Sequence, residues 1–465
     1  MKLARLQRAV AGGAQLALLA GLAGCVRSRV RGTEPSHVLL PPAPSSAVPP
    51  SRDSTRPSDR PDPGMPRDPA PRIRSEGERD VRVALATAAQ SAVVTASGPW
   101  RLFDSHDAVF VRARALDGWT IERRGRELRA MRNGAGATPW SSGPLTLRPE
   151  RGDAFGIFAG RRYRGSLRAI ATDSGLLVVN SLSVEDYLRG VVPLEIGERT
   201  VAEHAAAEAQ AIAARSYTVV RLGGTGNARN EYYDLLSSVA DQVYGGVDAE
   251  RPFSDHAVST TAGLVVMYGG RVVNAPYSSS CGGETAEPDE VWRATAEPYL
   301  KRVSDRIPGG ADRYYCDIAP RFAWTRAFSS PELDAVMRAY LRRYASVPSG
   351  GPGHVRSVMI ESRTPSGRVA RLAIATERGS FSLRGNDIRY VLRAAAGEML
   401  NSTYFTLDSE VGRDGGLTRL VVRGNGYGHG IGMCQWGAIG RARAGQTARA
   451  ILATYYPGTT VGSAY

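Results

Sequence analysis

The sequence predicts an α+β fold of two lobes, with antiparallel sheets and an Ala-rich core helix, preceded by a disordered linker. Residues 81–180 form short runs of alternating apolar and polar residues separated by Gly and Asn turns, which is typical of strands. Residues 204–217 contain seven alanines, which favour a closely packed helix. Residues 26–80 hold 12 of the 28 prolines and no aromatic residue, so they cannot bury enough surface to fold.

The N-terminus has the features of an export signal. Basic residues at 2, 5 and 8 precede an uncharged segment, residues 9–24, which is shorter than the about 20 residues of a membrane-spanning helix. Small residues then stand just before Cys25, as at a signal-peptide cleavage site. The ending Leu-Ala-Gly-Cys resembles a bacterial lipobox, in which Cys25 would be acylated and would anchor the mature protein in a membrane.

The anchor defines an expected location and domain order. Val26 follows the cysteine where an Asp would retain a lipoprotein in the inner membrane, so the outer membrane is expected in a Gram-negative cell. Plain secretion with an incidental cysteine is the alternative. The predicted divisions are a signal peptide with lipobox (1–25), a linker acting as a spacer (26–80), a β-rich lobe (81–175) and a second domain (176–465).

The composition favours a globular, basic protein. Hydrophobic residues make up 42% of the chain, and the formal net charge is +14. Such an excess suits polyanions or an anionic layer of the cell envelope. No zinc finger, basic helix or aromatic RNA-binding signature accompanies the charge, so no nucleic-acid partner is expected.

Glu195 is the first candidate for chemistry, because it lies in the apolar segment 191–197 just before a helix. Apolar neighbours raise the pKa of a carboxyl group, so that it can stay protonated and act as a general acid. The alternative is an ordinary acidic residue near a helix start, where the helix dipole favours negative charge. Thr200 and Glu203 form a capping-box pattern that predicts the start of the helix.

The remaining chain predicts a regular alternation of strands and helices. Residues 241–246 are expected as a short strand, residues 254–261 as a helix, and Gly269–Gly270 as the turn of a hairpin. Residues 330–345 have the pattern of an amphipathic helix, and residues 355–392 that of strand, turn, strand and helix. This antiparallel lobe carries no chemistry of its own.

Glycines fall at every second position from 424 to 432. In a strand, this spacing would remove the side chains from one face and let a neighbouring segment or a sugar approach, with His429 on the other face. The run does not fit the dinucleotide-binding pattern of Gly-x-Gly-x-x-Gly. Residues 434–456 are expected to form a helix.

Four ordered segments resemble the stage II sporulation protein D family (the SpoIID/LytB domain). They are residues 187–220, with Val-Val-Pro-Leu-Glu and the Ala-rich run, residues 241–246, residues 279–285 with Trp292 after them, and residues 426–438. The resemblance covers residues 175–465. Between Glu195 and the Ala-rich run, this chain is two residues longer than the common family spacing.

The resemblance implies a lytic transglycosylase that cleaves peptidoglycan glycan strands, often those already stripped of peptides, and leaves 1,6-anhydro-muramic acid ends. Glu195 matches the family's catalytic acid, and Glu198 is the reserve candidate. One carboxyl group is sufficient for this chemistry, because ring closure by the muramic acid C6 hydroxyl replaces the attack of water. No cofactor is expected.

The resemblance also implies a substrate groove. Arg215 is expected either to orient Glu195 or to bind a lactyl carboxylate. The expected groove residues are Arg215, Ser216, Tyr217, Gln242, Tyr244, Ser279, Ser280, Gly282, Gly283, Trp292, Tyr427, Gly428, His429 and Gln435.

Three cysteines follow Cys25 in the sequence: Cys281, Cys316 and Cys434. Cys281 and Cys316 could form a disulfide in an exported protein. A zinc site is the alternative, but no local ligand spacing supports it, and Ser278 stands where the family often has a His, so no metal is predicted. A thiol nucleophile formed by Cys434 and His429 is a further alternative, less favoured because the family usually has Ser at that position.

The same resemblance also implies an alternative function. Members described as amidase enhancers stimulate a cell-wall amidase, and this chain would then be a peptidoglycan-binding lipoprotein with an amidase partner. Glu195 would serve as a hydrogen-bond acceptor. A raised pKa of Glu195 would favour the acid role, and a pKa lowered by Arg215 would favour binding.

Overall fold

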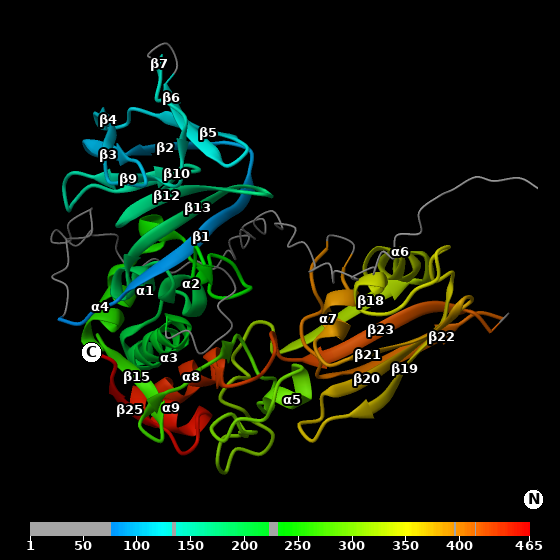
Figure 1. The fold of residues 1–465 in the computed structure, drawn as a ribbon. Coiled ribbons are helices and arrows are strands. Elements are labelled where there is room, and N and C mark those ends of the chain that lie inside the picture. Colours follow the sequence, from blue (N-terminus) through cyan, green and yellow to red (C-terminus); the bar gives the residue numbers. More distant parts are fainter. Residues whose placement is uncertain (1–75, 133–135, 223–230, 395–396, 414) are drawn as a thin grey trace, which may run out of the picture. The chain divides into compact units, whose positions relative to one another are not determined.

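The structure is a computed structural model that describes residues 76–132, 136–222, 231–394, 397–413 and 415–465. The predicted signal peptide, Cys25 and the predicted linker lie outside the described residues, except for the last few linker positions. Within the described ranges, no helix is both long and apolar enough to cross a membrane. The mixture of helices and antiparallel sheets confirms the predicted α+β class (Figure 1).

The N-terminal lobe consists of two sheets. The first has the strand order β14-β1-β13-β12-β9-β3-β4 and the second β11-β10-β2-β5-β6-β7, with β8 paired to β6. The strands are β1 (Asp80–Ala89), β2 (Ala92–Ala96), β3 (Trp100–Phe103), β4 (Val109–Ala113), β5 (Trp119–Arg124), β6 (Glu127–Arg132), β7 (Gly136–Ala137), β8 (Ser141–Ser142), β9 (Leu145–Pro149), β10 (Gly156–Phe158), β11 (Arg161–Tyr163), β12 (Ser166–Thr172), β13 (Gly175–Ser183) and β14 (Leu235–Leu236).

Alternating apolar residues of these strands supply the core of the lobe. Leu145 and Leu147 on β9 are fully buried, as are Trp100 and Leu102 on the neighbouring β3. This alternation is the period-two pattern by which the sequence predicts strands. Strand β13 pairs with β1 on one side and β12 on the other, so the sheet continues past residue 175 and leads directly into the helices.

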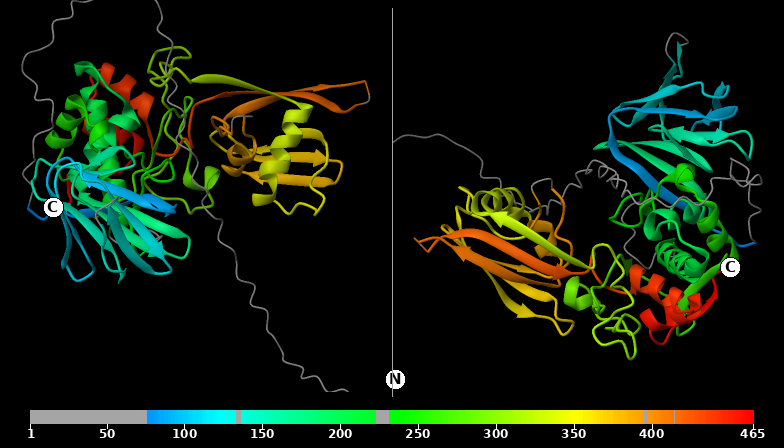
Figure 2. Two further views of the ribbon diagram at one scale, coloured as in Figure 1. Left: turned by 90° about the horizontal axis from the view of Figure 1, so that it is seen from above. Right: turned by 180° about the vertical axis from the view of Figure 1, so that it is seen from behind.

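A helical layer follows the sheet. It begins with α1 (Val184–Arg189), α2 (Val192–Ile196), the 3-10 turn η1 (Val201–Glu203) and α3 (His204–Leu222). The Ala-rich α3 is the predicted core helix, and the Glu203 carboxylate accepts the backbone N–H of Thr200 at 3.0 Å, as the capping pattern predicts. Six alanines of α3 are buried, which lets α4 (Pro252–Thr260), α8 (Gln435–Arg443) and α9 (Ala448–Tyr455) pack against it (Figure 2).

Two small sheets join distant parts of the chain in this layer. The predicted hairpin is confirmed as β15 (Leu264–Tyr268) and β16 (Arg271–Val272), and β15 also pairs with the last strand β25 (Thr460–Ser463). Strand β17 (Tyr277–Ser278) pairs in parallel with β24 (Met433–Cys434). The 3-10 turn η2 (Gly246–Ala249) precedes α4, and the short helix α5 (Pro288–Val291) follows β17.

Residues 323–425 form a second lobe with its own hydrophobic core. It contains β18 (Ala323–Ser329), α6 (Ser330–Tyr340), η3 (Leu341–Arg343), β19 (Val355–Arg363), β20 (Val369–Thr376), β21 (Gly379–Arg384), α7 (Asp387–Val391), β22 (Phe405–Val411) and β23 (Leu417–Asn425). Its two antiparallel sheets have the orders β18-β23-β22 and β19-β20-β21. The helix predicted at 330–345 is present but ends at Tyr340, and the predicted strand, turn, strand and helix are present with one additional strand, β21, before the helix.

The glycine-rich segment corrects one prediction. Strand β23 ends at Asn425, and Gly426, Gly428, Gly430 and Gly432 all have positive φ, at 80°, 112°, 77° and 70°. A run of positive φ values is incompatible with a strand, so alternation of glycine here reflects backbone conformation and not a bare sheet face. The following helix is also divided into α8 and α9, and residues 241–245 form no strand.

Candidate active site around Glu195

Glu195 is held by a short helix with defined ends. Helix α2 begins with Val192 and Pro193, and Pro at this position needs no N–H partner. The helix ends at Gly197, whose φ of 74° favours glycine. Glu195 is only partly exposed, while the preceding Leu194 keeps 46% of its surface in solvent. Glu195 therefore lies beside an exposed apolar side chain.

Two donors from distant segments reach the Glu195 carboxyl group. The backbone N–H of Val243 donates to Oε1 at 2.9 Å, and Gln435 Nε2 donates to Oε2 at 3.4 Å. Burial raises the pKa of Glu195, and the two hydrogen bonds lower it by a smaller amount, so that the resulting pKa is about 7. In the described part of the chain, no second carboxylate contributes to this shift. A carboxyl group with a pKa near neutrality can donate a proton at physiological pH.

Gln435 connects the carboxyl group to the core helix. As the first residue of α8, it directs Nε2 both to Glu195 and to the amide oxygen of Gln210 on α3, at 3.3 Å. Gln210 is fully buried. Gln210 is not among the predicted site residues. It is the one amide in the Ala-rich run of residues 204–217, and that contrast is the signal by which it could have been found.

A buried hydroxyl network lies behind the carboxyl group. Tyr187 and Thr218 both donate to Gln242 Oε1, at 3.1 and 3.0 Å, and Gln242 Nε2 donates to the Tyr277 hydroxyl at 2.9 Å. Glu195 contributes to the raised pKa of both tyrosines, after burial as the main cause for each, so its carboxyl group is near this network. The network fixes the wall on which Glu195 rests.

The serine and glycine motifs come together beside this wall. Ser280 and Tyr427 exchange backbone hydrogen bonds of 3.0 and 2.8 Å, and the N–H of Trp436 donates to Ser279 O at 3.0 Å. Gly282 and Gly428 are needed for this close approach, since a Cβ at either would lie 2.9 Å from the opposite segment. Both segments thus position Gln435 at the start of α8.

His429 forms a neutral aromatic pair with Trp292. The ring centroids are 4.8 Å apart, and His429 Nδ1 accepts the N–H of Ile431 at 3.0 Å. Burial, with the nearby positive charge of Arg389, lowers the pKa of His429 to about 3. The imidazole is therefore uncharged at neutral pH and can act as a hydrogen-bonding or stacking group.

Several predicted groove residues have structural partners instead. Arg215 is fully buried and pairs with Glu185 through two hydrogen bonds of 2.7 and 2.8 Å, so it neither orients Glu195 nor remains available to a lactyl carboxylate. Ser216 donates to the carbonyl of Ile212 and is also fully buried. The sequence pattern could not distinguish these buried contacts from ligand contacts, because both use polar residues on the same helix.

Tyr217, Gln242 and Tyr244, which were also predicted to line the groove, have structural partners as well. Tyr244 is 3% exposed, and its hydroxyl donates to Asn180 at 2.8 Å. Gln242 is fully buried in the network described above. The Tyr217 hydroxyl donates to Asp241 at 3.0 Å, and its ring lies beneath the Arg221 guanidinium. These residues support the site from behind.

The three cysteines meet at the other side of β24. All three are free and fully buried, and the Sγ atoms of Cys281 and Cys316 are 3.6 Å apart. The predicted pair is therefore adjacent, and the disulfide itself stays a prediction. Cys434 accepts backbone N–H groups and lies with these sulfurs, not with a base for nucleophilic catalysis. Burial raises the pKa of its thiol.

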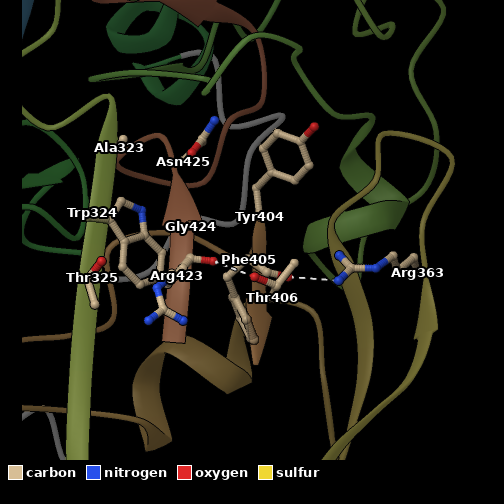
Figure 3. Close-up of a pocket in the computed structure, with 10 residues that line it drawn as sticks. All are labelled: Ala323, Trp324, Thr325, Arg363, Tyr404, Phe405, Thr406, Arg423, Gly424 and Asn425. Carbon is tan, nitrogen blue, oxygen red and sulfur yellow. Dashed lines mark hydrogen bonds between the residues drawn. The ribbon is translucent and has the colours of Figure 1, made fainter. Parts of the chain in front are cut away.

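A separate cavity of about 580 Å³ lies on the sheet of the second lobe (Figure 3). Gly424 lets the Trp324 ring and the Tyr404 carbonyl approach closely at this place, because a Cβ there would collide with both. The cavity contains none of the residues predicted for the site. Its lining residues are Ala323, Trp324, Thr325, Arg363, Tyr404, Phe405, Thr406, Arg423, Gly424 and Asn425.

Comparison with known proteins matches two parts of the chain. The family model "Stage II sporulation protein" matches residues 172–268, and a domain of unknown function, DUF8618, matches residues 312–432. An uncharacterised protein of Brachyspira hyodysenteriae is 31% identical over 302 residues, which cover 65% of this chain and 73% of that relative. The stage II sporulation protein D of Bacillus subtilis is 28% identical over 62% of this chain and 76% of its own length.

The fold and the Glu195 site therefore define a protein of the class that carries the SpoIID domain. The chain belongs to the stage II sporulation protein D family, as the motifs around Glu195 predict. The amidase enhancer of Bacillus subtilis is also 28% identical, over 59% of this chain, and the matched region is 40% of that longer relative.

Proposed function

We propose that this cell-wall-related protein is a peptidoglycan lytic transglycosylase with Glu195 as its single catalytic acid and base. The pKa of Glu195 near 7, at a residue that is partly exposed, is the observation that supports this role. At neutral pH, about half of such carboxyl groups carry a proton. Once such a group has donated its proton, the same Glu195 is the carboxylate that the second half of the reaction needs.

The reaction would balance with one carboxyl group. Glu195 donates its proton to the glycosidic oxygen as the bond to the muramic acid C1 breaks, and the leaving sugar departs as an alcohol. The Glu195 carboxylate then accepts the proton of the C6 hydroxyl as that oxygen bonds to C1. The product is a 1,6-anhydro ring, no water is consumed, and Glu195 ends protonated for the next cycle.

Arg199 is the better candidate for the lactyl carboxylate now that Arg215 is excluded. It follows Glu195 by four residues, and its guanidinium lies 5.3 Å from the ring of Trp436, the neighbour of Gln435. A cation beside an aromatic ring suits a glycan strand that carries carboxylates.

The test uses the purified protein, its Glu195→Gln variant and Glu198→Gln as a matched control at an exposed carboxylate. Each is incubated with intact and with amidase-treated peptidoglycan, and 1,6-anhydro products are measured by mass spectrometry. Wild type and Glu198→Gln should form these products, and Glu195→Gln should lose about 10²–10⁴-fold of the rate. Equal rates for all three proteins would refute the catalytic role of Glu195.

A second candidate function is enhancement of a cell-wall amidase, because one relative carries that name. The protein would then bind glycan and the amidase without cleaving any bond. In the same experiment, glycan binding by wild type without anhydro products, together with faster amidase turnover when the protein is added, would establish this role in place of the first.

A further inference from the structure

We propose that Cys281, Cys316, Cys434 and Asp305 form a structural zinc site. Their four potential ligand atoms lie within 4.8 Å of one another, and each residue is fully buried. The ligands come from three separate stretches: the loop after β17, the segment between α5 and β18, and strand β24. This separation explains why no local ligand spacing is visible in the sequence, and the proposal departs from the prediction that no metal is bound.

The two distances from the Cys281 sulfur are close to those of a tetrahedral site. With zinc–sulfur bonds of about 2.3 Å, two sulfurs of a tetrahedron lie about 3.8 Å apart, and a sulfur and a carboxylate oxygen about 3.5 Å. Cys281 Sγ lies 3.6 Å from Cys316 Sγ and 3.8 Å from Asp305 Oδ2. Three thiolates and one carboxylate are ligands that Zn²⁺ accepts, and thiolates disfavour Mg²⁺ and Ca²⁺.

Asp305 is oriented as an outer shell orients a ligand. Its Oδ1 accepts the Tyr455 hydroxyl at 2.7 Å and Arg441 Nη2 at 3.1 Å, so that Oδ2 is left facing the sulfur of Cys281. Gly437 of α8 makes room for this carboxylate, because a Cβ there would collide with it. Hydrogen bonds of this kind fix the geometry of metal ligands.

Cys434 has the surroundings of a thiolate. Its sulfur accepts the backbone N–H groups of Cys281 at 3.2 Å and Gly437 at 3.3 Å, and it caps the N-terminus of the nine-residue helix α8. Both the N–H donors and the helix dipole stabilise negative charge on sulfur. Without a metal, burial raises the pKa of this thiol, so metal binding must displace its proton.

The buried guanidinium of Arg368 lies next to the proposed zinc site and would balance a negative charge on it. Arg368 is 1% exposed, and its Nη2 donates only to the carbonyls of Cys281 and Glu284, at 2.7 and 3.0 Å. Its Nε and Nη1 have no hydrogen-bond partner among the described residues. Cys281 and Cys434 are among the groups that act on its pKa electrostatically. A zinc with three thiolates and a carboxylate has a net charge of −2, which Arg368 and Arg441 would balance.

Zinc binding would proceed without redox chemistry. Each of the three thiols releases one proton to solvent, and its sulfur donates an electron pair to Zn²⁺. The metal would hold the ends of β17 and β24 together and thereby fix the start of α8, where Gln435 reaches Glu195. Because the unfolded chain has no such site, the binding energy would add to stability.

The first test measures metal in the full protein, purified under reducing conditions without a metal-affinity tag. Elemental mass spectrometry should find about one zinc per chain. The three internal cysteines should resist alkylation until a chelator is added, and replacement by Co²⁺ should give a thiolate-to-cobalt charge-transfer absorption. Protein that holds no zinc and forms no such absorption, or that contains a Cys281–Cys316 disulfide by peptide mapping, would overturn the proposal.

Variants locate the site. Asp305→Asn and Cys316→Ser should lower the zinc content and weaken the cobalt absorption, while Asp317→Asn should not. Asp317 is the matched control because it is next to Cys316 in sequence but pairs with Arg313. Full zinc content in both ligand variants would contradict the assignment. If either variant fails to fold, alkylation and cobalt absorption of the wild-type protein still decide.

Discussion

Gln435 Nε2 donates to Glu195 Oε2 at 3.4 Å, across 240 positions of sequence. This contact closes the site, because it joins the first residue of α8 to the only carboxyl group that the α2 helix carries. The donor favours the charged form of Glu195, and burial favours the neutral form more strongly. The balance of the two sets the working pH of the proposed acid.

Gln435→Leu should raise the pKa of Glu195 above about 7, because the variant removes a donor that stabilises the carboxylate. The alkaline limb of the activity profile should move to higher pH. The same shift should be visible in the carboxyl carbon resonance of Glu195 in NMR titration. Gln90→Leu, at an exposed turn between β1 and β2, is the control and should leave both unchanged. A Glu195 pKa that does not rise would show that the amide makes no such contact in solution.

Glu195→Gln should make the protein more resistant to urea at alkaline pH. The pKa of Glu195 is about 7 in the folded protein, against an ordinary value of 4.5. Between these values the native carboxyl group holds a proton that the unfolded chain has lost, so its contribution to stability is complete below about pH 4.5 and is lost as pH rises through 7. The variant does not titrate.

Compared with wild type, the variant should therefore gain roughly 1–3 kcal/mol of unfolding free energy between about pH 4.5 and about pH 8. Urea unfolding at the two pH values measures the difference. Glu198→Gln, at an exposed carboxylate, should show no such pH-dependent gain. A difference between Glu195→Gln and wild type that is constant with pH would contradict the raised pKa.

Arg215→Met should act on folding and not on glycan binding. It leaves Glu185 as an unpaired buried carboxylate, which costs about 3–5 kcal/mol of unfolding free energy. Chemical denaturation measures the loss. Arg126→Met is the matched control, because Arg126 pairs with Asp173 on the surface and both side chains are more than 70% exposed. Unchanged stability of Arg215→Met, with weakened glycan binding, would instead support the ligand role first predicted for Arg215.

Gly430→Ala should destabilise the protein more than Gly269→Ala. Both glycines have positive φ, at 77° and 55°, which costs an alanine about 1–2 kcal/mol. At Gly430 the added Cβ would also collide with the guanidinium of Arg368, whereas nothing lies within 4 Å at Gly269. Thermal unfolding of the two variants measures the difference. Equal shifts would mean that the glycine run serves backbone conformation alone.

The sequence by itself determined the family, the α+β class, the Ala-rich helix and the candidate acid. These depend on local information: the period of apolar residues, the capping pattern at Thr200, and the ordered motifs around Glu195. The hairpin at Gly269–Gly270 and the helix of the second lobe were predicted for the same reason. Local pattern was misleading at residues 426–432, where alternate glycines suggested that the strand continues and positive φ values were found instead.

Only the tertiary structure decided which polar residues reach Glu195. The family motifs include Arg215, Ser216, Gln242 and Tyr244 as well as Gln435. In the structure the first four are buried with other partners, whereas Gln435 contacts Glu195. Residue spacing in the sequence indicates neither burial nor hydrogen-bond partners. From the sequence, the three cysteines could form either a disulfide or a metal site. The structure places Asp305 among them and the buried Arg368 guanidinium nearby. Contacts between segments more than 100 positions apart depend on packing of the whole core, which no local pattern encodes.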